Sequence, residues 1–191
     1  MKQIIIFILP LVLSGCVGLI ATGMNVNTAY NAYAISKDER GIYSIVSDKI
    51  IKTKIQSKIL GSKNLSNFDI DVEVFWAEVF LIGEVETLEQ KLELVEIAKN
   101  TNGVEKIKTY IKLKKDRVCS SSDELAILTS LKKELFSDSL INSTNIGVSV
   151  VQCDVVFSGV VESIEQEKRA IWYATHTQNV VDIYSFLRFA K

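Results

Sequence analysis

The chain has few of the residues that loosen a fold or build catalytic centres. Its 191 residues include one proline, nine glycines and one histidine. The scarcity of proline and glycine argues against a disordered or low-complexity chain. Basic and acidic residues number 22 and 23, and the resulting net charge of −1 excludes an overall field that would attract nucleic acid. The length is compatible with one or two small domains.

Motifs for catalysis are also missing from the sequence. It has no glycine-rich phosphate loop before a helix and no Gly-x-Ser-x-Gly elbow. His176 has no cysteine or carboxylate cluster at a spacing that would make a metal site or a general base. Glu86 with Glu89, and Glu162 with Glu165, fall where helices are expected to begin, a position that favours acidic residues through the helix dipole. The sequence therefore predicts a protein that is not an enzyme and uses no cofactor or metal ion.

One segment occurs twice and organises the chain. Residues 79–90, VFLIGEVETLEQ, return as residues 155–166, VVFSGVVESIEQ, and the offset between paired positions stays constant. Each copy predicts an apolar strand, a structural glycine at Gly83 or Gly159, and a helix start with a capping box. The same offset, which we call the repeat offset, matches apolar positions on both sides of the segment without a gap. The chain therefore holds two copies of one module in tandem.

The N-terminus has the pattern of an export signal. A short positive region and an apolar run of about ten residues end at Leu13-Ser14-Gly15-Cys16, and a run this short does not span a bilayer. The tetrapeptide resembles a bacterial lipobox, which implies a lipidated Cys16, and Val17 after it favours the outer membrane. We expect residues 1–15 to be a lipoprotein signal and residues 16–44 a lipidated tether. The alternative is a secretory signal with an incidental cysteine.

Hydrophobic periodicity predicts the order α-β-β-α-β in both modules. The first module, residues 45–113, is expected to have helices at 45–60 and 88–100 and strands at 68–74, 78–85 and 104–113. After a linker at 114–121, the second module, residues 122–191, is expected to have helices at 124–136 and 164–177 and strands at 145–151, 154–161 and 180–189. Two helices must cover one face of each three-stranded sheet to make a core, so the predicted fold class is α+β.

This order of elements, with Val-Phe-Leu-Ile-Gly at 79–83 and Gly-Val-Glu-Lys-Ile at 103–107, resembles the BON (bacterial OsmY and nodulation) domain. With the lipobox and tether, nearly the whole chain is similar to dual-BON lipoproteins of the outer membrane. The hairpin turns differ from the Asn-Gly or Gln-Gly that is usual in the family. They are Trp76-Ala77 and Gln152-Cys153 here. Asn179 stands where the family has a glycine at the entry to the last strand of the second module, and asparagine tolerates the left-handed conformation.

The resemblance implies a protein of the periplasmic face that binds anionic phospholipid and supports outer-membrane integrity. It makes the first helix of the second module the lipid-contacting element, with Lys132 and Lys133 as head-group contacts. The first helix of the first module is more basic, and the sequence leaves open which helix acts. Its lysines are Lys49, Lys52, Lys54 and Lys58. The alternative is a periplasmic scaffold or chaperone-like module that binds envelope proteins, which an exposed Trp76 at a hairpin tip would suit.

Two thiols remain once Cys16 is lipidated, and an exported protein works where disulfides persist. Cys119 lies just before the first helix of the second module. The next strand returns antiparallel along that helix, so the turn that contains Cys153 comes back to the helix start. We therefore expect a disulfide between Cys119 and Cys153. Unlinked thiols are the alternative, because a Cα separation cannot be read from sequence.

The lipobox prediction is tested by metabolic labelling with a radioactive or clickable fatty acid. Wild-type protein is expected to incorporate the label and to fractionate with the outer membrane, whereas the Cys16→Ala variant should do neither. A variant that still labels and still fractionates with the outer membrane would overturn the tether prediction.

Overall fold

The computed structural model describes residues 41–65 and 69–190, all within one compact unit. The predicted signal and residues 16–40 of the predicted tether lie outside the described residues. The first module contains α2 (Ile42–Gly61), β1 (Ile70–Phe75), β2 (Glu78–Val85), α3 (Leu88–Lys99) and β3 (Lys106–Leu113). The second contains α4 (Ser121–Ser137), β4 (Ile146–Val151), β5 (Asp154–Val161), α5 (Ile164–Thr175) and β6 (Ile183–Phe189), with short 3₁₀ turns at Lys114–Asp116 and Ser143–Asn145.

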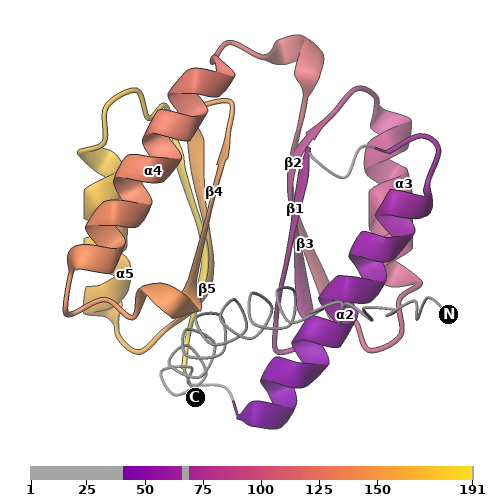
Figure 1. Cartoon of the computed structure of the whole chain (residues 1–191), viewed down its shortest axis with the longest axis horizontal. Coiled ribbons are helices and arrows are strands. Elements are labelled where there is room, and N and C mark those ends of the chain that lie inside the picture. Colours follow the sequence, from indigo (N-terminus) through magenta and orange to yellow (C-terminus); the bar gives the residue numbers. More distant parts are fainter. Residues whose placement is uncertain (1–40, 66–68, 191) are drawn as a thin grey trace, which may run out of the picture. The chain divides into compact units, whose positions relative to one another are not determined.

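The predicted α+β class and the α-β-β-α-β order are confirmed in both modules (Figure 1). In each three-stranded sheet the middle strand pairs antiparallel with the strand before it and parallel with the strand after the second helix. Two helices cover one face of each sheet. The first helix begins at Ile42, slightly before the expected start, and the last strands of both modules begin later than expected, at Lys106 and Ile183.

Each module has its own core between its helices and its sheet. In the first module Ile51, Ile55 and Ile59 of α2 pack with the inward residues of the strands. Their i, i+4, i+8 spacing places them on one helical face. In the second module Ile127, Leu131 and Leu135 of α4 occupy the equivalent place, at the repeat offset from the three isoleucines. The repeated apolar spacing thus produces two equivalent cores.

The glycines that the repeat singled out allow neighbouring strands to approach closely. Gly83 has φ +151° and Gly159 has φ +117°, a region that favours glycine. A Cβ atom at Gly83 would overlap the carbonyl oxygen of Asp69, and one at Gly159 would overlap that of Asn145. Any other residue at these positions would therefore push the first strand of its module away from the second.

The hairpin turns adopt left-handed backbone without glycine. Trp76 and Ala77 have φ values of 51° and 59°, and Gln152 and Cys153 have values of 53° and 64°. Two positive φ values are what a two-residue hairpin of type I′ requires, and they are unfavourable for residues with a Cβ atom. Asn179, which replaces the family glycine before the last strand of the second module, also has left-handed backbone, with φ 67°.

An acidic residue on the first helix holds each of these turns. Asp48 of α2 accepts hydrogen bonds from the backbone N–H groups of Trp76 and Ala77, both at 2.9 Å. Glu124 of α4 accepts one from the backbone N–H of Gln152 at 2.6 Å. Asp48 and Glu124 are equivalent positions of the two modules, separated by the repeat offset. A buried carboxylate that satisfies turn N–H groups offsets the strain of the turn.

The second turn is also held by a disulfide. Cys119 and Cys153 are bonded, with their Cα atoms 5.7 Å apart and a separation of 34 in sequence. This is the pairing expected from the sequence, and it ties the start of α4 to the β4–β5 turn.

Closing a loop of this length stabilises a domain by about 3 to 4 kcal/mol in the chain-entropy model. The Cys119→Ala/Cys153→Ala variant is therefore expected to lose roughly that much free energy of unfolding in a urea titration. Intact mass before and after reduction, combined with thiol alkylation, checks the bond itself. Protein purified from the envelope that alkylates at both positions without reductant would contradict it.

Candidate functional site

The outer face of each sheet carries helices, and the other face is buried against the other module. An apolar cluster lies between the two sheets, formed by Phe75, Phe80, Ile82, Val151, Val156 and Val160. Phe80 packs against Phe186 with ring centroids 5.8 Å apart. All eight residues of β2, and all eight of β5, are buried for this reason. The unit therefore contains two helix–sheet cores and a third core between the sheets.

Ion pairs frame this third core in a reciprocal pattern. Glu78 of the first module contacts Arg188 of the second at 2.7 Å, and Asp154 of the second contacts Lys112 of the first. Glu78 corresponds to Asp154, and Lys112 to Arg188, under the repeat offset. Each module thus offers an acid and a cation at equivalent positions, which is the pattern of an isologous interface.

Burial makes these contacts significant. Glu78 is 3% exposed and Asp154 is 2% exposed, so the loss of a partner would leave a buried polar group without a compensating contact. The hydroxyl of Tyr110 also donates to Asp154. Burial, together with the hydrogen bond and negative charge of Asp154, raises the pKa of Tyr110 above its ordinary value. Tyr110 therefore stays neutral and remains a donor across the interface.

The linker closes one end of the interface. The Gln152 amide donates to Glu84 Oε1 at 2.7 Å and to the carbonyl oxygen of Leu113 at 2.9 Å. The Arg117 guanidinium bridges Glu84 at 2.6 Å and Glu124 at 2.9 Å. These contacts hold β2, the linker, α4 and the β4–β5 turn together.

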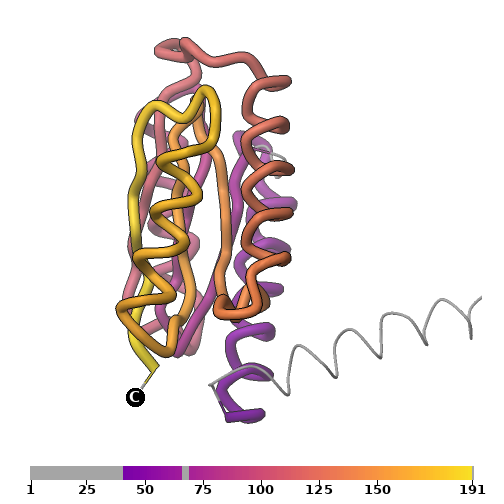
Figure 2. Tube along the Cα trace, turned by 90° about the vertical axis from the view of Figure 1, so that its left-hand side faces the viewer, coloured from indigo at the N-terminus to yellow at the C-terminus, as the bar shows by residue number. Residues whose placement is uncertain are grey.

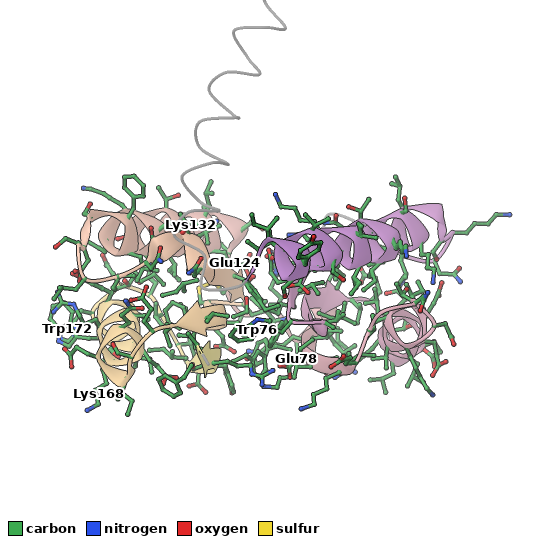
Figure 3. All side chains as sticks on the ribbon, turned by 90° about the horizontal axis from the view of Figure 1, so that it is seen from below. Trp76, Glu78, Glu124, Lys132, Lys168 and Trp172 are labelled. Atoms are coloured by element: carbon green, nitrogen blue, oxygen red, sulfur yellow. A yellow bond between two sulfur atoms is a disulfide. The ribbon has the colours of Figure 1, made fainter. Side chains whose placement is uncertain are left out.

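Trp76 is not the exposed tip aromatic that a protein-interaction surface would use. Its ring is half-buried beside the cluster between the sheets, and the Arg188 guanidinium lies 5.7 Å from the ring centroid. Figure 3 shows Trp76 between the two modules. Trp76 therefore belongs to the interface, and the feature that favoured a scaffold from sequence has a structural role.

The interface places the first helices of both modules on one side of the unit. Figures 2 and 3 show α2 and α4 on this side and α3 and α5 on the other. A groove of about 430 Å³ is lined by residues of α2 and β1 and by Thr144 of the second module. We call the outward surface of α2 and α4 the two-helix face. Its exposed basic and apolar members include Val46, Lys49, Ile50, Lys54, Leu125, Lys132, Lys133 and Phe136.

The lysines predicted to contact lipid divide into two groups. Lys52 is paired with Glu73 at 3.0 Å, and Lys58 donates to the carbonyl oxygen of Asn100 at 2.8 Å. Those two lysines hold α2 to the rest of the first module. The others are exposed on the two-helix face and make no ion pair within residues 41–65 and 69–190. They are Lys49, Lys54, Lys132 and Lys133.

Sequence reasoning missed the apolar side chains that accompany these lysines. Val46 and Ile50 on α2 are 50% and 49% exposed, and Leu125 and Phe136 on α4 are 63% and 73% exposed. The i, i+4 spacing of the first pair and the i, i+11 spacing of the second place each pair on one helical face. A helical-wheel plot of each helix would have shown these residues on the face opposite the buried isoleucine or leucine stripe.

No metal-binding cluster of cysteine, histidine and carboxylate is found among the described residues. His176 is exposed at the end of α5, where its Nδ1 lies 2.8 Å from the carbonyl oxygen of Trp172. Between residue 41 and residue 190, leaving out the undescribed 66–68, no helix has the length and apolar character to span a membrane.

Comparisons with known proteins assign one domain family to both modules. Residues 47–115 and 123–191 each match the BON domain. The chain is 26% identical over 148 residues to osmotically-inducible protein Y of Escherichia coli (strain K12), a match that covers 76% of this chain and 74% of that protein. Two structures of CdsD, a structural protein of the type III secretion system of Chlamydia trachomatis, match 74% and 75% of this chain. They do so at 14% and 13% identity over 63% and 67% of their own chains, with TM-scores of 0.31 and 0.29.

The fold defines an α+β protein built from two tandem modules. Because the two matched segments cover most of the sequence, this chain belongs to the BON domain family. BON domain proteins are envelope or periplasmic proteins, and the domain is linked to phospholipid binding. The osmotic-stress proteins of the family are not known enzymes.

The reciprocal ion pairs predict that the modules are coupled. Among the described residues, Arg188→Met leaves the buried Glu78 with the more distant Lys108, at 3.5 Å, as its ion-pair partner. The variant should lower the free energy of unfolding by about 1–3 kcal/mol. Lys99→Met is the matched control, because its ion pair with Glu96 is exposed on α3 and should change stability by less than about 0.5 kcal/mol. Equal effects in chemical denaturation would contradict the role assigned to Arg188.

Proposed function

We propose that this protein is a lipid-anchored envelope protein that binds anionic phospholipid surfaces and supports outer-membrane integrity from the periplasmic side. The observation that carries the proposal is the exposed surface of α4. Lys132 and Lys133 lie there beside Leu125 and Phe136, and all four side chains point away from the core of the module.

Basic and apolar side chains on one surface act at different stages of membrane binding. Each exposed lysine near an anionic membrane contributes about 1 kcal/mol, and this attraction decays within a Debye length of roughly 8–10 Å. Apolar side chains such as Phe136 then enter the boundary between head groups and acyl chains. The expected binding is therefore peripheral, sensitive to salt and dependent on anionic lipid.

Lipidation of Cys16 would supply the second attachment. A single acyl chain gives weak and reversible membrane binding, and stable attachment needs further chains or a basic surface. Attachment of Cys16 to the outer membrane would keep the modules close to its periplasmic leaflet. Binding by α4 would then select regions rich in anionic lipid.

The second candidate function is a periplasmic scaffold or chaperone-like module. Leu125 and Phe136 favour it to some extent, since exposed apolar residues also suit a protein partner. The two candidates differ in their requirement for lipid charge, because a scaffold has no reason to sediment with anionic vesicles.

Co-sedimentation with phosphatidylglycerol-containing vesicles tests the proposal. The wild-type chain should bind these vesicles, bind phosphatidylcholine vesicles poorly, and lose binding as salt is raised. Lys132→Glu/Lys133→Glu should weaken binding at least about tenfold, because both attractions become repulsions.

The matched control is Lys99→Glu/Lys168→Glu, which makes the same change in net charge on α3 and α5. Figure 3 shows Lys168 on the side away from Lys132. Equal losses in both variants would indicate that only net charge matters. Unchanged binding of the Lys132→Glu/Lys133→Glu variant would remove α4 as the site.

A further inference from the structure

We infer that α2 and α4 contact one anionic bilayer at the same time, so that the membrane lies across both modules on the two-helix face. This inference rests on the proposed function and adds the first helix of the first module as a second contact. The occupant of the face is a lipid surface that carries phosphate head groups and negative charge.

The charge of α2 suits such a surface. Between Ile42 and Gly61 the helix contains four lysines and a single acid, Asp48. Asp48 is 3% exposed, and its carboxylate is bonded to the hairpin turn. The exposed surface of α2 therefore presents no carboxylate of its own, while Lys49 and Lys54 are exposed at its sides.

The exposed apolar residues of α2 are similar in kind to those of α4, although they do not occupy equivalent positions of the two modules. Val46 and Ile50 lie opposite the buried isoleucine stripe of α2 and between the two exposed lysines. On α4, Lys132 lies between Leu125 and Phe136 along the same helical face, since steps of seven and eleven are close to whole numbers of turns. Both helices thus present apolar side chains and lysines together on one exposed face, which is the surface of an interfacial helix.

The interface between the sheets fixes the two helices relative to each other. α2 and α4 lie on the same side of the unit in both side views. The third core, the reciprocal ion pairs and the linker contacts hold that arrangement. Once α4 has bound, α2 is presented to the same bilayer at a high effective concentration, so the two contacts reinforce each other.

The order of the sequence supports the same orientation. α2 begins directly after the segment that links it to the predicted lipid attachment at Cys16. Of the described helices, α2 is therefore the one covalently closest to the anchor.

Depth-dependent quenching tests whether both helices enter the bilayer. An environment-sensitive fluorophore is attached to Ile50→Cys or Phe136→Cys in the mature chain that also carries Cys16→Ala, since Cys119 and Cys153 are bonded. Vesicles of phosphatidylglycerol and phosphatidylcholine contain brominated acyl chains as the quencher. Leu92→Cys is the matched control, because Leu92 is 67% exposed and belongs to α3, a helix on the other side of the unit from α2 and α4.

Quenching at Ile50 and Phe136, without quenching at Leu92, is the expected result. Quenching at Phe136 alone would overturn the two-helix inference and leave lipid binding by α4 intact. Quenching at all three positions would also overturn it, because the protein would then have no defined orientation. Absence of quenching at every position would overturn the proposed function as well.

The coupling between the helices is measured with the probe at Phe136. Lys49→Glu/Lys54→Glu should weaken the vesicle affinity reported from α4 by about tenfold or more, although neither residue lies on α4. Lys99→Glu/Lys168→Glu is again the control and should have a much smaller effect. An unchanged affinity in the α2 variant would show that α4 binds alone.

Discussion

The packing of the two sheets against each other is the interaction on which the rest of the structure depends. A single module can bury one face of its sheet under two helices, but the other face carries Phe80 and Ile82, or Val156 and Val160. Leaving those faces in water would cost about 25 cal/mol for each Å² of apolar surface. Pairing the modules removes both faces from water at once, which explains why the middle strands are buried throughout.

The same packing determines what the surface can do. Because the sheets meet face to face, every helix lies on the outside of the unit, and α2 and α4 come to one side. The lysines that are free for a ligand are those that the sheets and turns do not use. Lys52 and Lys58 hold α2 in place, whereas Lys49, Lys54, Lys132 and Lys133 are exposed and make no ion pair with another described residue. The lysines proposed to bind a ligand are thus those that do not stabilise the fold.

Acidic residues serve the fold in a way that composition does not reveal. Asp48 and Glu124 hold the hairpin turns, and Glu78 and Asp154 secure the interface between the modules. These carboxylates are largely withdrawn from the outer surface. A chain with a net charge near zero can therefore present a basic face, because several of its negative charges are used inside.

By itself, the sequence determined the α-β-β-α-β order, the two modules and the equivalent structural glycines Gly83 and Gly159, since these follow from local periodicity and the constant repeat offset. The expected order of the elements also gave the expectation of the Cys119–Cys153 bond. Tertiary structure alone decided that the second face of each sheet is buried, that Trp76 lies in the interface, and which lysines form contacts within the fold. The physical reason is that periodicity reports which residues share a face, whereas the partner of that face depends on contacts between residues as far apart as Glu78 and Arg188.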